Sequence, residues 1–486
     1  MRAALRSPRR LRIEILAGLV VALALIPEAI SFSILAGVDP RVGLFASFTM
    51  AVSIAFLGGR PAMISAATGA VALVIAPVVR GYGMDYFIAT VILAGVIQVV
   101  LGVLGAARLM RFVPRSVMVG FVNALAILIF MAQVPHLIGV PWAVYPMVVV
   151  GLLVMVYLPR LTTIVPAPLV AIVLLTGATV VAAIAVPNVG DQGSLPDSLP
   201  SLFVPHVPLT LETLRIIAPY SLAMALVGLM ESLMTAKLVD DVTDTHSHKT
   251  REAWGQGVAN IITGFFGGMG GCAMIGQTMI NVKVSGARTR ISTFLAGVFL
   301  LILVVGLGDI VSVIPMGALV AVMIMVSVGT FDWHSVRAST LRRMPRSETF
   351  VMVATVVVVE LTHNLAIGVV LGTVVAMVLF VRRVAHFTSV VDVAHPDEDT
   401  RVYAVLGELF FASSNDLVTQ FDYVGDPRNV VIDMSQSHIW DASTVATLDA
   451  IQMRYAAKGK TATIIGLNDA SAARHERLAG HLGGGH

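Results

Sequence analysis

The stretch Ile13-Glu-Ile-Leu-Ala-Gly-Leu-Val-Val-Ala-Leu-Ala-Leu-Ile-Pro-Glu-Ala-Ile-Ser-Phe-Ser-Ile-Leu35 is an apolar run in which Glu28 is the only ionisable residue after Glu14. The run exceeds the roughly 20 residues that a transmembrane helix needs. A carboxylate at bilayer depth is costly, so it usually faces a protein-lined cavity, where it carries protons or binds ligand. Pro27 interrupts the helical hydrogen bonds just before the acid, which is tolerated where a helix lines a cavity. We therefore predict a functional Glu28, with a structural acid bonded to a neighbouring helix as the alternative.

The composition indicates an integral membrane protein. Of 486 residues, 57% are hydrophobic and 13% are charged, whereas soluble proteins contain about 25% charged residues. The charges cluster between apolar runs, so the net charge of +3 reflects basic loops and does not indicate nucleic-acid binding. The single cysteine, Cys272, excludes an intrachain disulfide framework. Five arginines precede the first run and no small-residue cleavage site follows it, so we expect a retained span and not a signal peptide.

Fourteen apolar runs predict fourteen membrane spans, several of them short. They lie near 13–35, 42–57, 62–79, 86–106, 116–134, 143–158, 163–186, 213–236, 253–266, 272–284, 291–308, 311–328, 349–362 and 365–381. If residues 1–12 are cytoplasmic, the inner connections hold the basic clusters at Arg60, 108–115, Arg160, 237–251, 283–290, 337–346 and 382–383. The long outer loop, 187–211, has no Lys or Arg. This asymmetry follows the positive-inside rule and predicts both termini on the cytoplasmic side of a bacterial inner membrane.

The third and tenth runs are short and follow paired glycines, in Phe56-Leu-Gly-Gly-Arg-Pro61 and Phe265-Phe-Gly-Gly-Met-Gly-Gly271. The string Ala-Met-Ile then recurs, at residues 62–64 and 273–275. The two runs correspond if the membrane domain, 13–383, contains two seven-span repeats at about 13–186 and 213–381. An odd-numbered repeat must be inverted in the bilayer. Paired short, Gly/Pro-interrupted segments are the sequence feature that best indicates a transporter's central site.

A helix that begins at mid-membrane presents unpaired N–H groups and about half a positive charge. Two such ends facing each other can bind an anion without Lys or Arg. The residues at these ends are small or polar: Ser65, Ala66, Ala67, Thr68 and Gly69 in the third run, and Gly276, Gln277 and Thr278 in the tenth. We predict that they bind the substrate. Close helix packing through small residues is the alternative.

Other polar residues have less specific interpretations. Glu231, in the first span of the second half, lies nearer the cytoplasmic end and is either a gate or a structural anchor. Phe32 and Asn281 are further candidates for gate or structural roles. We expect Asn123 to hydrogen-bond between helices. For the polar loop containing His246 and His248, a solvated loop is favoured over a metal site. No metal, cofactor or nucleotide motif is present, so we expect neither an enzyme nor hydrolysis-driven transport.

Residues 384–486 read as a separate small domain. Tyr403–Phe411, Asn429–Met434 and 461–466 have the patterns of strands, and Asp441–Ala457 and 468–478 those of helices. Alternating strands and helices predict a small parallel or mixed sheet flanked by helices.

Several motifs resemble the sulfate permease family, also called solute carrier family 26. They are Pro27-Glu-Ala-Ile-Ser-Phe-Ser-Ile-Leu-Ala-Gly37, Gly264-Phe-Phe-Gly-Gly268 and 281–292, while Val430-Val-Ile-Asp-Met434 and Trp440-Asp-Ala-Ser-Thr444 resemble the family's STAS domain. The resemblance implies an all-α membrane domain of fourteen spans in two inverted repeats with core and gate domains, a cytoplasmic α/β STAS domain that can bind a partner, a homodimer, and secondary anion transport.

Three residues depart from the family's pattern. The family commonly has Gln at Glu28, Pro at Ala67 and, in STAS regulators, a phosphorylated Ser at Ala442. The acid at Glu28 suggests proton coupling in place of simple exchange, and Ala442 argues against a phosphoserine switch at that position.

These observations predict a proton-coupled symporter of a small anion. Glu28 takes up a proton from outside and offsets the anion's charge during the crossing. We favour a C4-dicarboxylate such as fumarate or succinate, with sulfate and bicarbonate as the other candidates. The alternatives are a nucleobase–proton symporter and a membrane-tethered sensor that signals through its STAS domain.

Overall fold

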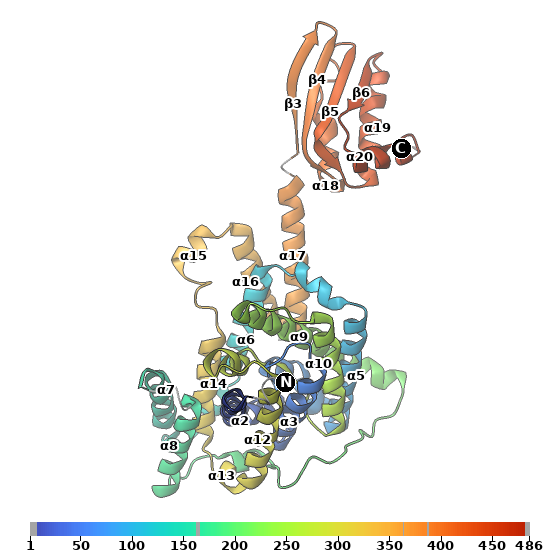
Figure 1. The fold of residues 1–486 in the computed structure, drawn as a ribbon. Coiled ribbons are helices and arrows are strands. Elements are labelled where there is room, and N and C mark those ends of the chain that lie inside the picture. The colour runs from blue at the N-terminus through green and yellow to red at the C-terminus, as the bar shows by residue number, and fades with distance from the viewer. Residues whose placement is uncertain (1–6, 162–165, 363, 386–387, 482–486) are drawn as a thin grey trace. The chain divides into compact units, whose positions relative to one another are not determined.

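The computed structural model describes residues 7–161, 166–362, 364–385 and 388–481, which form a helical unit and a unit built on a sheet (Figure 1). The chain divides into two compact units, Met1–Thr373 and Val374–His486. The boundary lies within α17 (Leu365–Ala385), the last helix before the sheet. The last predicted span therefore continues into the segment that leads to the C-terminal unit.

The first half of the helical unit follows the order of the predicted spans. Its elements are α2 (Pro8–Ala36), α3 (Pro40–Leu57), β1 (Ser65–Ala66), α4 (Gly69–Tyr82), α5 (Met84–Val103), η1 (Ala106–Phe112), α6 (Arg115–Met131), η2 (Val134–Leu137), α7 (Val144–Leu161), α8 (Ala167–Val181) and η3 (Val189–Gln192). Proline occupies the first position of both α2 and α3, where its missing N–H costs no helical hydrogen bond.

The second half repeats this order, with two extra short helices, α13 and α15. Its elements are α9 (Leu211–Thr243), α10 (Lys249–Phe265), β2 (Cys272–Ala273), α11 (Ile275–Met279), η4 (Ile280–Val284, a π-helical turn), α12 (Arg290–Gly306), α13 (Gly308–Ser312), α14 (Met316–Thr330), α15 (Ala338–Arg343), α16 (Arg346–Thr362) and α17. In both halves the third segment thus begins as a short strand and continues as a helix.

Glu28 lies on a helix that continues through its proline. α2 extends past Pro27 to Ala36 and ends at Gly37, whose φ of 81° is left-handed, a conformation that glycine adopts without a side-chain penalty. The Ser31 hydroxyl donates to the carbonyl of Pro27 at 2.8 Å. The helix keeps its register across the proline, so Glu28 and Phe32 occupy the same face, one turn apart.

The helices of the first unit pack in two groups. In one group α2 and α3 pack against α12, and α5 packs against α9 and α10. In the other, α6 packs against α14 and α16, and α7 against α8 and α14. The two groups meet where α2 contacts α14 and where α4 contacts α6. Buried apolar side chains fill the space between these helices as one continuous core.

The strands β1 and β2 lie inside this core as an antiparallel pair, with Ser65 opposite Ala273 and Ala66 opposite Cys272. The N–H of Met274 extends the pairing by donating to the carbonyl of Ile64 at 2.9 Å. The sequence analysis predicted broken helices here but no strands. Pairing satisfies the backbone groups that each broken helix would otherwise leave buried without partners, and it joins the two halves of the chain.

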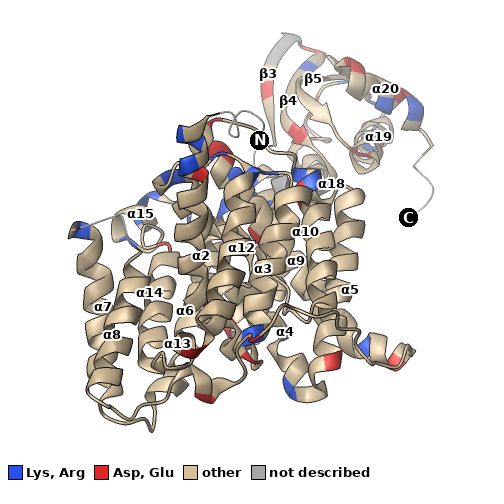
Figure 2. Cartoon of the chain, turned by 60° about the horizontal axis from the view of Figure 1, so that its bottom comes forward, with Lys and Arg blue, Asp and Glu red and all other residues tan. Residues whose placement is uncertain are grey.

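By length and composition, seven of the described helices could cross a membrane: α2, α3, α5, the segment Arg115–Leu137, α7, α9 and α17. Four further apolar helices are shorter: α4, α8, α12 and α14. The count of fourteen spans therefore stays a prediction. Figure 2 shows a nearly uncharged middle band across the helical unit, with most Lys and Arg gathered at the end that carries α15, as the charge asymmetry of the sequence predicts.

The second unit is a four-stranded mixed sheet, of order β3-β4-β5-β6, flanked by helices. It contains β3 (Ser389–Asp397), β4 (Thr400–Leu409), α18 (Phe411–Leu417), η5 (Val418–Gln420), β5 (Asn429–Ile439), α19 (Ala442–Ala456), β6 (Thr461–Ile465) and α20 (Asp469–Leu478). β3 pairs antiparallel with β4, and the other two pairings are parallel. The predicted strands and helices of this unit are confirmed, while β3 and α18 were not predicted.

Candidate functional site

A cavity of about 390 Å³ lies where the two groups of helices meet. Its walls come from both halves of the chain and both packing groups: Glu28 and Phe32 on α2; Thr68, Gly69 and Ala70 at the start of α4; Phe121, Val122, Leu125 and Ile129 on α6; Glu231 and Met234 on α9; Met274, Ile275, Gly276 and Gln277 around the start of α11; and Val326, Gly329 and Thr330 on α14. Both predicted helix N-termini and the two acids Glu28 and Glu231 therefore line the same cavity.

Glu28 contacts the second half of the chain through one hydrogen bond. The Gln277 side-chain amide donates to Glu28 Oε1 at 2.5 Å. Both side chains are buried, with Glu28 8% and Gln277 4% exposed. From the sequence alone, these two residues have separate predicted roles, proton coupling and substrate binding. In the structure they are direct partners.

Glu231 lines the same cavity, although its sequence position suggested a place nearer the cytoplasmic end. Its Oε2 accepts a hydrogen bond from the Cys272 thiol at 2.9 Å. The Cys272 sulfur also lies 3.1 Å from the hydroxyl of Thr68. Thr68 in turn caps α4, because its hydroxyl accepts from the N–H of Val71. Sequence reasoning missed this role of Cys272, since a lone cysteine on an apolar strand has no distinguishing pattern.

The cavity contains acids but no bases. Among the described residues that line it, Glu28 and Glu231 are the only charged side chains, and none is Lys, Arg or His. The hydrogen-bond donors among its walls are neutral: the Gln277 amide, the Thr68 and Thr330 hydroxyls, and backbone N–H groups at the start of α4. A helix N-terminus favours negative charge, whereas an ionised carboxyl beside it opposes that charge.

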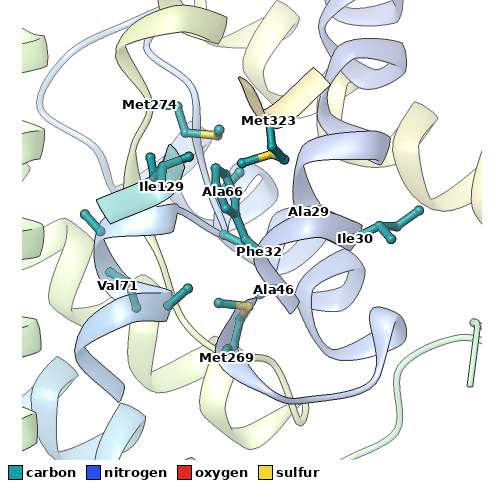
Figure 3. Close-up of a cluster of buried hydrophobic side chains, with 14 of the residues drawn as sticks. Ala29, Ile30, Phe32, Ala46, Ala66, Val71, Ile129, Met269, Met274 and Met323 are labelled. Atoms are coloured by element: carbon teal, nitrogen blue, oxygen red, sulfur yellow. The ribbon is translucent and has the colours of Figure 1, made fainter. Parts of the chain in front are cut away.

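Phe32 covers the start of α4. A side chain at Gly69 would place its Cβ 2.8 Å from Phe32 Cε1 and 3.2 Å from Ile129 Cδ1. Figure 3 shows the Phe32 ring in the middle of a group of side chains that includes Ile129 and Met274. Gly69 is therefore required where the aromatic ring approaches the helix, and Phe32 forms one wall of the space beside the cap.

Four of the predicted binding residues lie beside the cavity and do not line it. Ser65 accepts a hydrogen bond from the buried Gln256 amide at 2.6 Å, and Thr278 accepts from the N–H of Ile64 at 3.0 Å. Ala66 is paired in β1. Ala67 donates its N–H to the Ser47 hydroxyl at 3.3 Å, a bond that the proline common in the family could not make. These residues hold the strand pair in place behind the site.

Asn281 and Asn123 also have structural partners. The Asn281 amide donates to the Ala62 carbonyl and the Ser292 hydroxyl, at 2.8 and 3.0 Å. The Asn123 amide donates to Ser335 at 2.9 Å, and its oxygen accepts from the N–H of Asp332 at 2.8 Å. Asn281 ties η4 to the segment before β1, and Asn123 ties α6 to the segment after α14.

The polar loop with the two histidines lies beside an ion-pair network. Asp240 pairs with Arg60 at 3.0 Å and with Lys249 at 2.7 Å. Within the part of the chain that the structure describes, no group of three or more His, Cys, Asp or Glu side chains is placed to hold a metal ion. Asp240 therefore serves the ion pairs that join α9 to the segment before β1.

The profile of the sulfate permease family matches residues 11–148 and 140–355, and the STAS domain profile matches residues 392–480. The chain belongs to the sulfate permease family. "Putative sulfate transporter YbaR" of Bacillus subtilis (strain 168) is 52% identical over 470 residues, which cover 96% of this chain and 97% of that protein. Membership makes this chain an integral membrane protein of an anion-transporter family, and not an enzyme.

More distant relatives agree with this assignment. "Bicarbonate transporter BicA" of Picosynechococcus sp. is 23% identical over 498 residues, covering 91% of this chain and 87% of that protein. The solved structure of the murine Slc26a9 anion transporter in its inward-facing state has a TM-score of 0.81 at 15% identity, covering 96% of this chain and 87% of that one. These matches confirm the predicted fold class of a helical membrane domain followed by a small α/β STAS domain.

The walls contributed by α6 and α14 were not predicted as part of the site. Phe121, Val122, Leu125 and Ile129 belong to an ordinary apolar run, and Val326 and Gly329 to another. Apolar wall residues have the same pattern as any membrane helix. Only the packing of the second group of helices against the first brings them to the cavity.

Proposed function

We propose that the chain is a proton-coupled symporter of a small anion, which binds in the cavity between the starts of α4 and α11. The observation that carries this proposal is a cavity lined by two carboxyls and no base. Ionised Glu28 and an anion about 5 Å apart would repel each other by about 3 kcal/mol at an effective dielectric of about 20. Protonation of Glu28 removes that repulsion, so the anion and the proton favour each other's binding.

Gln277 links the two binding events. While Glu28 is ionised, the Gln277 amide donates to it. Once Glu28 takes up a proton from outside, this amide is free to turn toward the anion beside Gly276 and the cap of α4. Proton uptake thus removes a negative charge and supplies a donor in one step. Uptake of both ligands then allows the core, α2–α5 with α9–α12, to move against the gate, α6–α8 with α13–α17.

Two relatives and the walls of the site narrow the choice of anion. YbaR is named for sulfate and BicA for bicarbonate, so these two anions come first. The cavity is much larger than either ion, and apolar side chains of α6 and α14 form much of its wall. Those walls suit a substrate with a carbon skeleton, which keeps succinate and fumarate as candidates.

The test of the anion is an uptake screen in proteoliposomes with radiolabelled sulfate, bicarbonate, succinate and fumarate, and with uracil as the non-anionic comparison. We expect saturable uptake of at least one anion and none of uracil. Saturable uptake of uracil alone would contradict the proposal.

Chains that end after Arg383 should still transport, because the cavity lies wholly within Met1–Thr373. Loss of flux from a folded protein of this length would instead favour the sensor alternative.

The topology completes the proposal. Two inverted seven-span repeats place both termini in the cytoplasm, and the protein works as a homodimer in the bacterial inner membrane, with its STAS domain available to a cytoplasmic partner. The equal order of elements in the two halves supports this arrangement, since β1–α4 and β2–α11 occupy the same rank in each. Cysteine labelling of single-cysteine variants on the loop 187–211, from outside intact cells, tests the orientation.

A further inference from the structure

Three side chains form a hydrogen-bonded chain that links Glu231, the second acid of the cavity, to Thr68, the cap of α4. The Cys272 thiol donates to Glu231 Oε2 at 2.9 Å, and its sulfur lies 3.1 Å from Thr68 Oγ1. Glu231 and Thr68 both line the cavity, whereas Cys272 lies behind it on β2 and is completely buried. Cys272 is therefore placed to act on the anion site through its two neighbours.

The donors along this chain can point in only one direction at a time. With Glu231 ionised, the carboxylate accepts the thiol proton, so the sulfur can only accept from the Thr68 hydroxyl. The Thr68 oxygen meanwhile accepts from the N–H of Val71. In this arrangement the single hydroxyl proton of Thr68 is directed at sulfur and away from the cavity.

A proton on Glu231 reverses the direction. Its carboxyl can then donate to the sulfur, the thiol donates to Thr68 Oγ1, and the Thr68 hydroxyl turns its proton toward the cavity. Glu231 gains one proton, whereas the thiol and the hydroxyl only rotate and each keep their own proton. The state of Glu231 is thereby transmitted to the cap of α4.

The described surroundings of Glu231 add no other charge to this chain of three side chains. Among the described residues, Glu28 is the one other ionisable side chain of the cavity. The charged side chains on the elements packed against α9 have other partners. The acids Glu252 and Asp85 accept from backbone N–H groups, those of Gly59 and Arg60 and that of His206. Lys249 pairs with Asp240, Arg251 donates to the carbonyls of Phe56 and Leu57, and Arg80 donates to the carbonyl of Leu35. Tyr82 and Tyr86 stack on each other, and Arg108 on η1 is exposed.

We propose that Cys272 is a positioning residue for anion transport, which ties the carboxyl of Glu231 to the hydroxyl of Thr68 so that the donor facing the anion follows the state of Glu231. This inference rests on the proposed function, because it assigns Thr68 a contact with the anion. It adds a second acid to the coupling and a route by which that acid reaches the substrate.

The variants Cys272→Ala, Cys272→Ser and Ser232→Ala test this role. Ser232 accepts from the N–H of Ala273 at 3.1 Å, so Ser232→Ala weakens the same strand one residue further on and leaves the chain of three side chains intact. Cys272→Ala should raise KM for the transported anion about tenfold, with Vmax changed less, since a lost hydrogen bond in a buried site has about this effect. Cys272→Ser keeps a donor and an acceptor and should restore KM to within about threefold of the parent.

A double-variant cycle separates positioning from packing. With Thr68→Val in the background, Cys272→Ala should change KM by less than about twofold, because the group through which it acts is already gone. An unchanged KM in Cys272→Ala, an equal KM change in Ser232→Ala, or fully additive effects with Thr68→Val would each overturn the proposal.

The parent protein supplies a second measurement that requires no variant. Because Cys272 is the chain's one cysteine, its S–H stretching band can be assigned directly by infrared spectroscopy. We expect the band to shift when saturating sulfate, bicarbonate or fumarate, whichever is transported, is added to the reconstituted protein. A band that does not move with a transported anion would refute the relay. If no anion is transported, the proposed function itself has failed, which is a different outcome.

Discussion

Gln277 donates its side-chain amide to Glu28 at 2.5 Å, which joins α2 of the first half of the chain to α11 of the second. The bond places the acid that we propose for proton coupling directly beside a donor that we propose for the anion. The amide has two N–H groups, and one of them is directed at Glu28, so an anion beside this amide would lie close to the ionised carboxylate. Protonation of Glu28 removes that repulsion, which is the physical reason for expecting proton and anion binding to be linked.

Replacing Gln277 with Met keeps the length of the side chain and removes the donor. We expect KM for the anion to rise about ten- to hundredfold, since hydrogen bonds to charged groups contribute about 1.5–3 kcal/mol. The control is Gln133→Met, because Gln133 is buried just after α6, donates to the Ile129 carbonyl of that helix, and does not line the cavity. Equal KM values for Gln277→Met and the parent would argue against a contact between this amide and the anion.

Alanine substitutions of the two glycines at the helix starts should differ in their effect on stability. A Cβ at Gly276 meets no atom within 4 Å, whereas one at Gly69 meets Phe32 at 2.8 Å. Gly276→Ala should therefore fold like the parent but bind anion more weakly, because its methyl group occupies cavity space. Gly69→Ala should also destabilise the fold, because overpacking costs about 1–3 kcal/mol, and should therefore lower the thermal midpoint.

Phe32→Ala provides the check on this explanation. In the Phe32→Ala background the atoms that the new methyl group would meet are gone, so Gly69→Ala should lower the thermal midpoint by less than it does in the parent. The measurement is thermal unfolding of the four proteins in detergent. An equal decrease in both backgrounds would show that the contact between Phe32 and residue 69 is not the cause.

The ion pairs of Asp240 should govern stability and leave anion affinity unchanged. Asp240→Asn leaves the buried guanidinium of Arg60 without its counter-ion, a loss of about 3–5 kcal/mol for a buried pair. Arg60→Met should cost less, because Asp240 keeps Lys249. The expected order of thermal midpoints is parent, Arg60→Met, then Asp240→Asn, with KM of the folded fraction unchanged. The reverse order of the two variants would contradict this account.

The STAS domain contains a buried carboxylate whose loss should unfold that unit selectively. Asp426 accepts from the hydroxyls of Tyr403 and Tyr455 at 2.8 and 2.5 Å and pairs with Arg401 at 2.7 Å. Asp426→Ala should remove about 3–5 kcal/mol and abolish the near-ultraviolet circular dichroism of the tyrosine cluster. Asp449→Asn is the control, since Asp449 accepts only one exposed backbone N–H among the described contacts. An unchanged spectrum in Asp426→Ala would show that the cluster does not depend on Asp426.

The same cluster predicts loss of stability at alkaline pH. Burial, and then the hydrogen bond to Asp426, raises the pKa of Tyr403 and of Tyr455. A folded pKa above the unfolded value of about 10 means that the neutral phenols stabilise the fold below about pH 10. This contribution is lost as pH rises through the raised values. Spectral titration of the intact protein should show these two phenols ionising only as the domain unfolds, and early ionisation in the folded domain would disagree.

The sequence predicts the fold class and several residues of the candidate site better than it predicts the backbone structure around that site. Glu28, Gln277 and the Gly-Gly pairs stand out because polar or flexible residues are rare in apolar runs. The strand pair β1–β2 does not, since two-residue strands have no periodicity to detect. For the same reason the sequence does not reveal that Ser65 bonds the Gln256 amide and Thr278 the N–H of Ile64, beside the cavity.

The contacts of Glu231 and Cys272 could not be predicted for a different reason. They depend on β2 lying beside α9 and opposite Ala66, which is a long-range pairing between the two halves. The position of Glu231 in its helix suggested the cytoplasmic end, yet the cavity reaches it. Tertiary packing, and not the local sequence, decides which polar groups share a cavity.

Uptake into proteoliposomes under an inward proton gradient, with the parent and Glu28→Gln side by side, distinguishes a proton-coupling role of Glu28 from a structural one. Gln at this position can still accept a hydrogen bond from Gln277 but cannot bind a proton, so the site should keep its shape. The account predicts gradient-driven accumulation of the anion by the parent and none by Glu28→Gln, with matching thermal midpoints. Equal gradient-driven accumulation by both proteins would contradict it and leave Glu28 as a structural acid.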